Sequence, residues 1–164
     1  MTMQKITPCL WFDTQAEEAV NFYIGLFKNS KITSTLLTDA AVAEVSGQPE
    51  GSVLFIAFEL DGDRLSALNG GPSFKFNESI SLMIECSTQE EIDHYWYGLI
   101  ADGGQESQCG WLKDKFGVSW QVLPKQLLEM QRDKDSTKAG RVMKAMLGMR
   151  KLDLKALENA FNNG

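Results

Sequence analysis

The sequence repeats one pattern of residues, TQAEEAVNFYIGLF at 14–27 and TQEEIDHYWYGLI at 88–100. In both copies the apolar residues recur at spacings of three and four, which predicts an amphipathic helix. Both copies begin with Thr-x-x-Glu, the pattern of a capping box. Short apolar segments at 6–12 and 80–86 precede the two copies and predict strands. The repeat therefore indicates a fold built from two similar strand–helix modules.

Further strands follow each predicted helix. After the first helix come apolar segments at 30–38, 52–60 and 64–69, and an Asp-Gly-Asp turn between the last two predicts a hairpin. After the second helix come 105–113, in which two strands are hard to separate, and 118–124. The order βαβββ, stated twice, predicts an α+β fold with a mixed or antiparallel sheet rather than a doubly wound one.

These elements divide the chain into three parts. We expect a first βαβββ module at 1–72, a second at 73–124 and a helical C-terminal tail at 125–164, all in one compact domain. In the tail, Leu152, Asp153 and Leu157 fit a hydrophobic staple around an N-cap, so a last helix is expected to end near 161. We expect the tail to pack on the sheet modules or on a partner subunit.

Composition narrows the classes of function. Sixteen basic and 22 acidic residues give a formal net charge of -6, which argues against a nucleic-acid or anionic-membrane surface. No apolar stretch approaches the length of a membrane span and no secretory signal is indicated, so we expect a cytoplasmic protein. The three cysteines, Cys9, Cys86 and Cys109, lack the spacing of a zinc site and are expected to be free thiols.

The doubled module resembles the vicinal oxygen chelate superfamily, which includes glyoxalase I, extradiol dioxygenases and the bleomycin and fosfomycin resistance proteins. The blocks WFDTQAEEAVNFY, LNGGPSFKFNESIS and CGWLKDKFGVSWQVLP are similar to those of its PhnB-like subgroup, often labelled 3-demethylubiquinone-9 3-methyltransferase-like. The resemblance implies that the two modules pair their sheets into a cup that holds the ligand, and that the protein is a homodimer.

The methyltransferase label gets no support from the residues. A nucleotide-type cofactor such as S-adenosylmethionine usually lies on a parallel sheet with a glycine-rich turn between a strand and a helix. Gly70-Gly71-Pro72 follows a predicted strand but leads into no periodic helix, so it is interpreted as a turn. We expect no methyltransferase activity.

The superfamily's enzymes typically hold a divalent metal with histidine or glutamate near the start of each module's first strand and on each module's last strand. Here the resemblance puts these positions on Thr7, Ser81 and Gln121, and on either Ala67 or Asn69 in the fourth strand. All of these side chains are neutral and poor metal ligands. The only histidine, His94, falls on the polar side of the second predicted helix. We therefore expect no metal and no cofactor.

Strand alternation predicts which other side chains face the cup. The candidate ligand-binding residues combine aromatic rings, which stack on a flat apolar ligand, with neutral hydrogen-bonding groups, although any single aromatic is more often core. Two weaker candidates for chemistry are Glu85, a general base or a solvated rim residue, and Cys109, a nucleophile or an inert thiol whose only cationic neighbour in sequence is Lys113. The ligand-binding candidates are Trp11, Asn69, Phe76, Ser81, Trp111 and Gln121.

Three functions fit these patterns. The favoured hypothesis is a metal-independent, PhnB-like homodimer that binds a small organic molecule in the cup between the modules. The second is a lyase, isomerase or dioxygenase that acts on vicinal oxygens with a metal held by Glu85 or another carboxylate. The third is a resistance protein that sequesters a drug without chemistry.

Overall fold

The computed structural model describes residues 5–163, which fall into two compact units that divide after Phe76. The segment 73–76, predicted to open the second module, thus lies with the first unit. The tail lies with the second unit. No helix within residues 5–163 combines the length and hydropathy needed to cross a bilayer.

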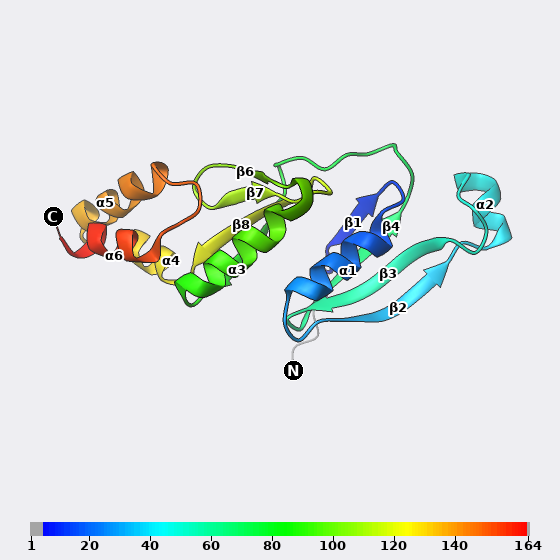
Figure 1. Ribbon diagram of the computed structural model, residues 1–164, viewed down its shortest axis with the longest axis horizontal. Helices are drawn as coiled ribbons and strands as arrows, with labels where there is room; N and C mark the ends of the chain where they lie inside the picture. The colour runs from blue at the N-terminus through cyan, green and yellow to red at the C-terminus, as the bar shows by residue number, and fades with distance from the viewer. Residues whose placement is uncertain (1–4, 164) are drawn as a thin grey trace. The chain divides into compact units, whose positions relative to one another are not determined.

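The first unit contains one four-stranded sheet with order β1-β4-β3-β2 (Figure 1). Strand β1 runs parallel to β4, and the β2–β3 and β3–β4 pairs are antiparallel. Helix α1 lies along one face of this sheet (Figure 1). Its elements are β1 (Cys9–Phe12), α1 (Ala16–Leu26), β2 (Lys31–Leu37), α2 (Ala40–Ser46), β3 (Val53–Leu60) and β4 (Asp63–Asn69).

The second unit repeats this topology with order β5-β8-β7-β6, in which β5 is parallel to β8. The predicted α+β architecture of two tandem modules with a helical tail is confirmed. The segment 105–113, predicted as poorly separated strands, forms β6 and β7, with Cys109 and Gly110 at positive φ between them. The elements are β5 (Leu82–Cys86), α3 (Gln89–Ile100), a short 3-10 helix η1 (Ala101–Gly103), β6 (Gln105–Glu106), β7 (Trp111–Lys113) and β8 (Ser119–Pro124).

Helix α2 was not predicted. It is seven residues long, too short for spacings of three and four to show a helical period, and none of its residues is buried. Its ends are nevertheless marked, because the Asp39 side chain accepts a hydrogen bond from the Val42 N–H and Gly47 adopts the left-handed φ of 71°. The predicted hairpin turn is confirmed, with φ of 49° at Asp61 and 89° at Gly62.

The two long helices begin differently. At α3 the Thr88 half of the predicted capping box is confirmed, since Thr88 Oγ1 accepts from the Glu91 N–H at 3.3 Å. Glu91 Oε2 accepts from the Ser87 N–H, one residue before the N-cap, at 2.6 Å. At α1 the prediction is wrong, because the N-cap residue is Gln15 and makes no side-chain cap. The Ala16 N–H instead donates to Asn69 Oδ1 at 2.9 Å, from the end of β4.

The tail forms α4 (Gln126–Gln131), α5 (Ser136–Leu147) and α6 (Leu154–Asn162). The predicted staple is confirmed: Leu152 and Leu157 are fully buried, and Asp153 Oδ1 accepts from the Ala156 N–H. The tail packs on the second unit, in line with one of the two predicted arrangements. Its apolar core is shared with β8 and consists of Leu123, Leu127, Met130, Val142, Leu152 and Leu157.

Candidate ligand-binding site

Each sheet has one face under its long helix and one face turned away from it, which we call the distal face. Residues paired across neighbouring strands share a face. In the first sheet Asn69 reaches the start of α1, so Asn69 and its partner Phe12 lie on the helix side. By alternation and cross-strand pairing, the distal face of the first sheet carries Cys9, Trp11, Phe55, Ala57, Ser66 and Leu68.

In the second sheet the helix side is marked by Glu106, whose carboxylate accepts from Trp96 Nε1 of α3 at 3.0 Å. Glu106 pairs with Leu112, and Leu112 pairs with Trp120, so these side chains share that face. Trp120 therefore faces the helix. The distal face of the second sheet then carries Met83, Glu85, Trp111, Lys113, Ser119, Gln121 and Leu123.

One row across the second distal face combines three kinds of side chain. Met83 of β5 pairs with Gln121 of β8, and Gln121 pairs with Trp111 of β7. Gln121 Nε2 donates a hydrogen bond to Ser81 Oγ at 2.8 Å. Met83 is 52% exposed, and Trp111 and Gln121 are half-buried, so the row is accessible from solvent. The structure thus brings together three of the six predicted ligand-binding residues, Ser81, Trp111 and Gln121.

The other three candidates belong to the first unit, and two of them lie off its distal face. Asn69 is buried, and its Nδ2 donates to the Val53 carbonyl oxygen while its Oδ1 caps α1, so its predicted orientation is wrong. The ring of Phe76 packs edge-on against Phe12, which faces the helix, so this predicted orientation is wrong as well. Strand alternation does not predict these two orientations, because Asn69 lies at a strand end that caps a helix and Phe76 lies in a loop.

Trp11 does lie on the distal face of the first sheet. Its indole N–H donates to the Gly71 carbonyl oxygen at 2.9 Å, and its ring meets Phe74 edge-on at 5.0 Å between centroids. The backbone at Gly70 passes so close that an added Cβ would lie 2.2 Å from the Trp11 ring. The Gly-Gly-Pro segment therefore fixes this ring in place, and its interpretation as a turn that leads into no helix is confirmed.

The positions that the resemblance assigns to metal ligands hold neutral side chains in both units. Ser81 and Gln121 are hydrogen-bonded to each other, and Thr7 is exposed in the first unit. The register also answers the question of the fourth strand, because Cys9 pairs with Ser66 as Met83 pairs with Gln121. The counterpart of Gln121 is therefore Ser66, and neither Ala67 nor Asn69. Among residues 5–163, no group of three His, Cys, Asp or Glu side chains lies close enough to hold a metal ion.

The two candidates for chemistry lie apart from the central row. Glu85 is exposed and pairs with Leu123, one row beyond Met83. Cys109 is half-buried in a turn with φ of 59°, and its N–H donates to the Met149 carbonyl oxygen. Lys113, its predicted cationic neighbour, forms an ion pair with Glu78. His94 is exposed on α3, as predicted.

The three cysteines are free thiols, as predicted, and they differ in surroundings. Cys9 is exposed on the first distal face, whereas Cys86 is fully buried on the helix side of β5. Burial raises the pKa of the Cys86 thiol to about 12, and the negative charge of Glu91 adds to the effect. A thiol in this state is an inert core residue.

Sequence reasoning missed the role of Asp114, which lies near the row. Asp114 is buried, and its carboxylate accepts hydrogen bonds from the Phe116 N–H, the Val118 N–H and Trp120 Nε1, so it holds the β7–β8 turn together. The signal was the Asp-x-x-Gly turn itself, in which an acidic first residue commonly binds backbone N–H groups. Ser119 carries a buried hydroxyl that has no hydrogen-bond partner within the described part of the chain.

Residues 4–123 match the family model described as 3-demethylubiquinone-9 3-methyltransferase. The chain belongs to this family. A PhnB protein from Bacillus cereus is 36% identical in a match that covers 74% of this chain and 99% of that chain, with a TM-score of 0.65. The chain is thus a PhnB-like member of the vicinal oxygen chelate superfamily, which confirms the resemblance.

More distant structures share the fold alone. A protein from Pseudomonas aeruginosa is 18% identical over 75% of this chain and 98% of its own, with a TM-score of 0.59. The fosfomycin resistance protein FosX from Listeria monocytogenes, solved with Mn(II) and sulfate, is 13% identical over 80% of this chain and 98% of its own, with a TM-score of 0.54. A comparison with curated proteins finds no match.

Proposed function

We propose that this PhnB-like protein binds a small organic molecule on the distal face of its second sheet, the face that the resemblance assigns to the ligand cup. The observation that carries the proposal is the hydrogen bond from Gln121 to Ser81, set in one row between Met83 and Trp111. An amide and a hydroxyl flanked by an aromatic ring and a thioether are the usual constituents of a small-molecule site.

The chemistry of the row suggests the kind of ligand. Trp111 offers an aromatic surface and Met83 a flexible, polarisable one, so a flat apolar group is favoured between them. The Gln121 carbonyl oxygen and the Ser81 hydroxyl each keep hydrogen-bonding capacity beyond their mutual bond, so the ligand is expected to carry a hydroxyl, carbonyl or amide group. The buried Ser119 hydroxyl on the same strand would gain a partner from a polar group that reached it.

We further propose that binding needs no metal. Support comes from the two ligand positions on this face, which hold an amide and a hydroxyl already bonded to each other. Glu85 is the one carboxylate that the described strands of the second sheet place on the distal face. A single carboxylate with neutral neighbours is a weak site for a divalent ion.

Methyl transfer, which the family's description names, is not part of this proposal. The sheet of each unit is mixed, with one parallel pair and antiparallel pairs beside it. The Gly70-Gly71 segment leads into no helix, so it does not form the turn on which a nucleotide-type cofactor usually lies.

The four tryptophans provide a test with internal controls. We would record indole N–H resonances of ¹⁵N-labelled protein while adding a library of aromatic metabolites and antibiotics. A ligand on the proposed face should shift Trp111 and leave Trp96 and Trp120, whose indole N–H groups bind Glu106 and Asp114, unchanged. Shifts confined to Trp96 or Trp120, or no shift from any compound, would contradict the proposal. A hit restricted to antibiotics would instead favour drug sequestration.

A matched pair of variants tests the row. Gln121→Leu removes the amide at nearly constant volume, and it should weaken binding of any hit by about 10-fold, since a hydrogen bond to a ligand contributes roughly 1.5 kcal/mol. Gln131→Leu changes an amide on α4, which bonds Met146, and should leave affinity unchanged. Equal effects of the two changes would place the ligand elsewhere.

Metal analysis separates the proposal from a metal-dependent enzyme. Protein purified without chelator should contain far less than one equivalent of Mn, Fe, Ni or Zn. Stoichiometric metal that is lost in Glu85→Gln but kept in Glu90→Gln, an exposed carboxylate on α3, would overturn the metal-independent proposal in favour of a lyase, isomerase or dioxygenase.

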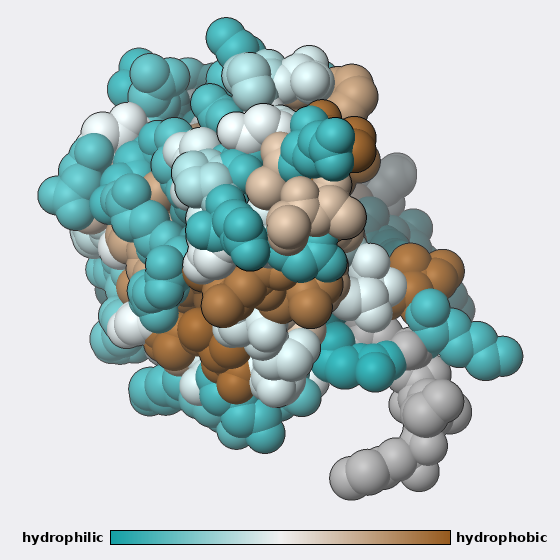
Figure 2. All heavy atoms as spheres, turned by 90° about the vertical axis from the view of Figure 1, so that its right-hand side faces the viewer, coloured by the Kyte–Doolittle hydropathy of each residue, from teal (hydrophilic) through white to brown (hydrophobic). Residues whose placement is uncertain are grey.

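The homodimer is also a proposal. Strand β2 is the edge of the first sheet, and all seven of its residues are exposed. Leu36 and Leu37 at its end, and Val45 on α2, expose more than half of their surface, and Figure 2 shows apolar side chains among polar ones on the side of the molecule where α2 lies. An exposed apolar edge strand is a common pairing surface. Sedimentation equilibrium should give a dimer that Leu36→Lys weakens, and a monomeric wild-type protein would contradict this.

A further inference from the structure

The tail is joined to the second unit at the end of the proposed ligand-binding row. Leu123 lies on the distal face two residues beyond Gln121 and pairs with Glu85. Although it is on that face, Leu123 is only 8% exposed, because it belongs to the apolar core of the tail. The distal face is therefore accessible at Met83 and covered at Leu123.

Leu152 of the tail and Leu123 of β8 both approach Gly110. A Cβ built on Gly110 would lie 3.0 Å from Leu123 Cδ2 and 3.2 Å from Leu152 Cδ1, so the two leucine side chains converge over this glycine. Gly110 has a φ of 84°, a conformation that favours glycine, and its missing side chain leaves the space that the leucines use. Leu152 is fully buried.

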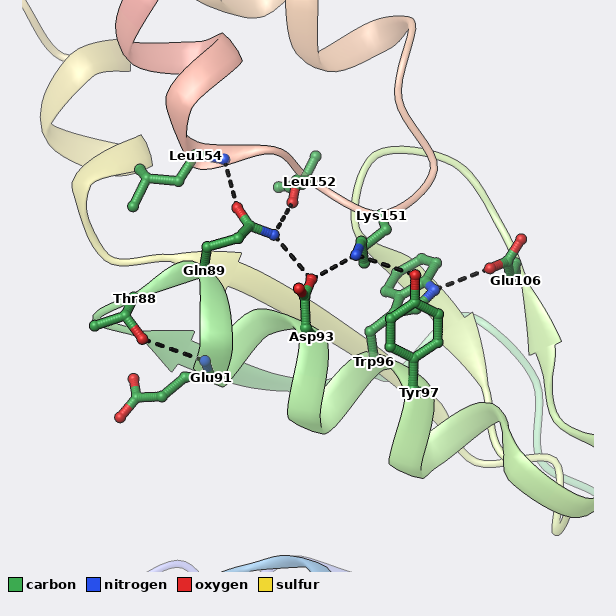
Figure 3. Close-up of polar contacts among 10 residues, drawn as sticks. All are labelled: Thr88, Gln89, Glu91, Asp93, Trp96, Tyr97, Glu106, Lys151, Leu152 and Leu154. Atoms are coloured by element: carbon green, nitrogen blue, oxygen red, sulfur yellow. Dashed lines mark hydrogen bonds and ion pairs between the residues drawn. The ribbon is translucent and has the colours of Figure 1, made fainter.

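Polar contacts hold the segment that carries Leu152, through residues before and after it in the chain (Figure 3). Gln89 of α3 brackets it, since its Nε2 donates to the Leu152 carbonyl oxygen at 3.2 Å and its Oε1 accepts from the Leu154 N–H at 2.9 Å. Lys151 Nζ binds Asp93 Oδ1 at 2.5 Å and Tyr97 Oη at 3.1 Å.

The turn before β7 also holds the residues that precede Leu152 in the chain. The Cys109 and Gly110 N–H groups donate to the carbonyl oxygens of Met149 and Arg150, both at 2.8 Å. Leu152 is thus held by side chains and backbone, which makes it a fixed part of the second unit.

We propose that the tail forms an end wall that limits how far a ligand on the second distal face can extend along β8, and that Leu152, acting through Leu123, sets this limit. The inference rests on the proposed function. The family match ends at residue 123, directly before the tail, so the wall is built from residues outside the matched region. The maximum length of a bound ligand then depends on this tail rather than on the family's two modules.

A homologous series of 4-n-alkylphenols, from ethyl to octyl, is the probe. Its hydroxyl suits Gln121 and Ser81, its ring suits Trp111, and its chain can lengthen toward Leu123. Each buried CH₂ should strengthen binding roughly fourfold, from about 0.8 kcal/mol per group. In the wild-type protein, affinity measured from the Trp111 indole shift should stop rising at a certain chain length. In Leu152→Ala the rise should continue for about two more carbons, the space left by the removed side chain.

Leu157→Ala is the matched control, because it makes the same change in the same core but on α6. It should leave the limiting chain length as in the wild type. Should Leu152→Ala not fold, Leu152→Val and Leu123→Val remove one carbon each and should move the limit by about one carbon.

The outcomes separate the two proposals. An unchanged limit in every Leu152 and Leu123 variant that folds, with binding still reported by Trp111, would overturn the end wall and leave the proposed function standing. An equal change of the limiting chain length in Leu157→Ala would also overturn the end wall. Any cavity in the core of the tail would then have the same effect, whether or not it lies next to Leu123. No Trp111 shift from any phenol, or from the compounds of the earlier screen, would remove the proposed function and the end wall with it.

Discussion

The two units have the same strand order but differ in how the long helix begins and in what the distal face offers. In the first unit α1 is capped by Asn69 from β4, whereas in the second α3 is capped by Thr88 directly before it. At equivalent places on the two distal faces, Trp11 stands where the other unit has Glu85, and Ser66 stands where it has Gln121.

This difference shows which features the topology requires. Register and burial on the helix side are preserved in both units, while caps and distal side chains vary. Helix-facing residues are constrained by packing, whereas a helix start needs only some acceptor for its first N–H groups. Parts of the distal faces, such as Cys9, Met83 and Glu85, are exposed and not under that constraint, so they can diverge toward different chemistry.

The largest expected effect is a loss of stability in the second unit alone. Asp114→Ala leaves two backbone N–H groups and the Trp120 indole N–H without their acceptor in a buried turn. We expect a loss of about 3 to 5 kcal/mol, since each unsatisfied buried group costs about 1 to 3 kcal/mol. Hydrogen exchange resolved by segment should show faster exchange in β7 and β8 and unchanged exchange in the first sheet.

Asp13→Ala, at an exposed carboxylate of the first unit, is the control and should change stability by less than about 0.5 kcal/mol. Faster exchange in both sheets of Asp114→Ala would show that the two units do not behave as separate structures.

The reaction rates of two cysteines compare the distal face of the first unit, which carries Cys9, with the helix side of the second, which carries Cys86. Cys9 is exposed and should react with iodoacetamide on the order of 100-fold faster than Cys86, which must wait for local opening. Mass spectrometry of the alkylated peptides over time gives both rates, and similar rates would show that β5 opens readily.

The raised pKa of Cys86 also predicts a pH dependence. The unfolded thiol ionises near its ordinary pKa of 9.0, while the folded one stays protonated to about 12. The folded state therefore binds the extra proton in this window, and stability falls as pH rises from about 9 toward 12. Cys86→Ala should flatten this fall in urea titrations, and an identical slope would contradict the assignment.

The helix starts can be compared by one substitution in each unit. Asn69→Ala removes the acceptor of the Ala16 N–H and the donor to the Val53 carbonyl inside the protein, and we expect a loss of about 2 to 3 kcal/mol. Thr88→Ala removes one exposed cap and should cost about 1 kcal/mol. Thr14→Ala, the predicted but unused cap, should be nearly neutral. A larger loss for Thr88→Ala than for Asn69→Ala in urea unfolding would reverse the comparison.

The smallest effect concerns the tail, which only the second unit has. The hydrogen bonds from Lys151 and then Gln89 hold the pKa of Asp93 below its usual value. Because this pKa is lowered, the stabilisation is present above about pH 4 and is lost as pH falls through the folded pKa. The pair is partly exposed, so Asp93→Asn should cost no more than about 1 kcal/mol.

Protection factors of the Leu152 and Leu154 amides, which correct for the intrinsic pH dependence of exchange, should fall in acid in the wild type and show a weaker pH dependence in Asp93→Asn, with Glu158→Gln as an exposed control on α6. An unchanged pH dependence in Asp93→Asn would exclude this ion pair as the cause.

The sequence predicted the parts of the fold that repeat and alternate. The amphipathic helices, the hairpin at Asp61-Gly62 and the staple around Asp153 follow local patterns, and all are present. Helix α2 was missed because its seven residues are too few to show a helical period. The cap on α1 was missed because its acceptor, Asn69, lies 53 residues away, where no local pattern can show it.

The candidate site was predicted where strand alternation holds. Ser81, Trp111 and Gln121 come together because strand parity and register decide their placement. Asn69 and Phe76 were placed on the wrong side because a strand end and a loop do not follow that parity. The counterpart of Gln121 could be found only from the observed pairing of Cys9 with Ser66.

The distant cap of α1 sets an order of events during synthesis. The acceptor for the second helix is three residues from its donor, so α3 can complete its first turn as soon as that turn has left the ribosome. The acceptor for α1 is 53 residues downstream, so the first module must wait for its own last strand and close a long loop before its helix is complete. The start of α1 is therefore completed only once β4 has been made, whereas the start of α3 needs no residue beyond its own first turn.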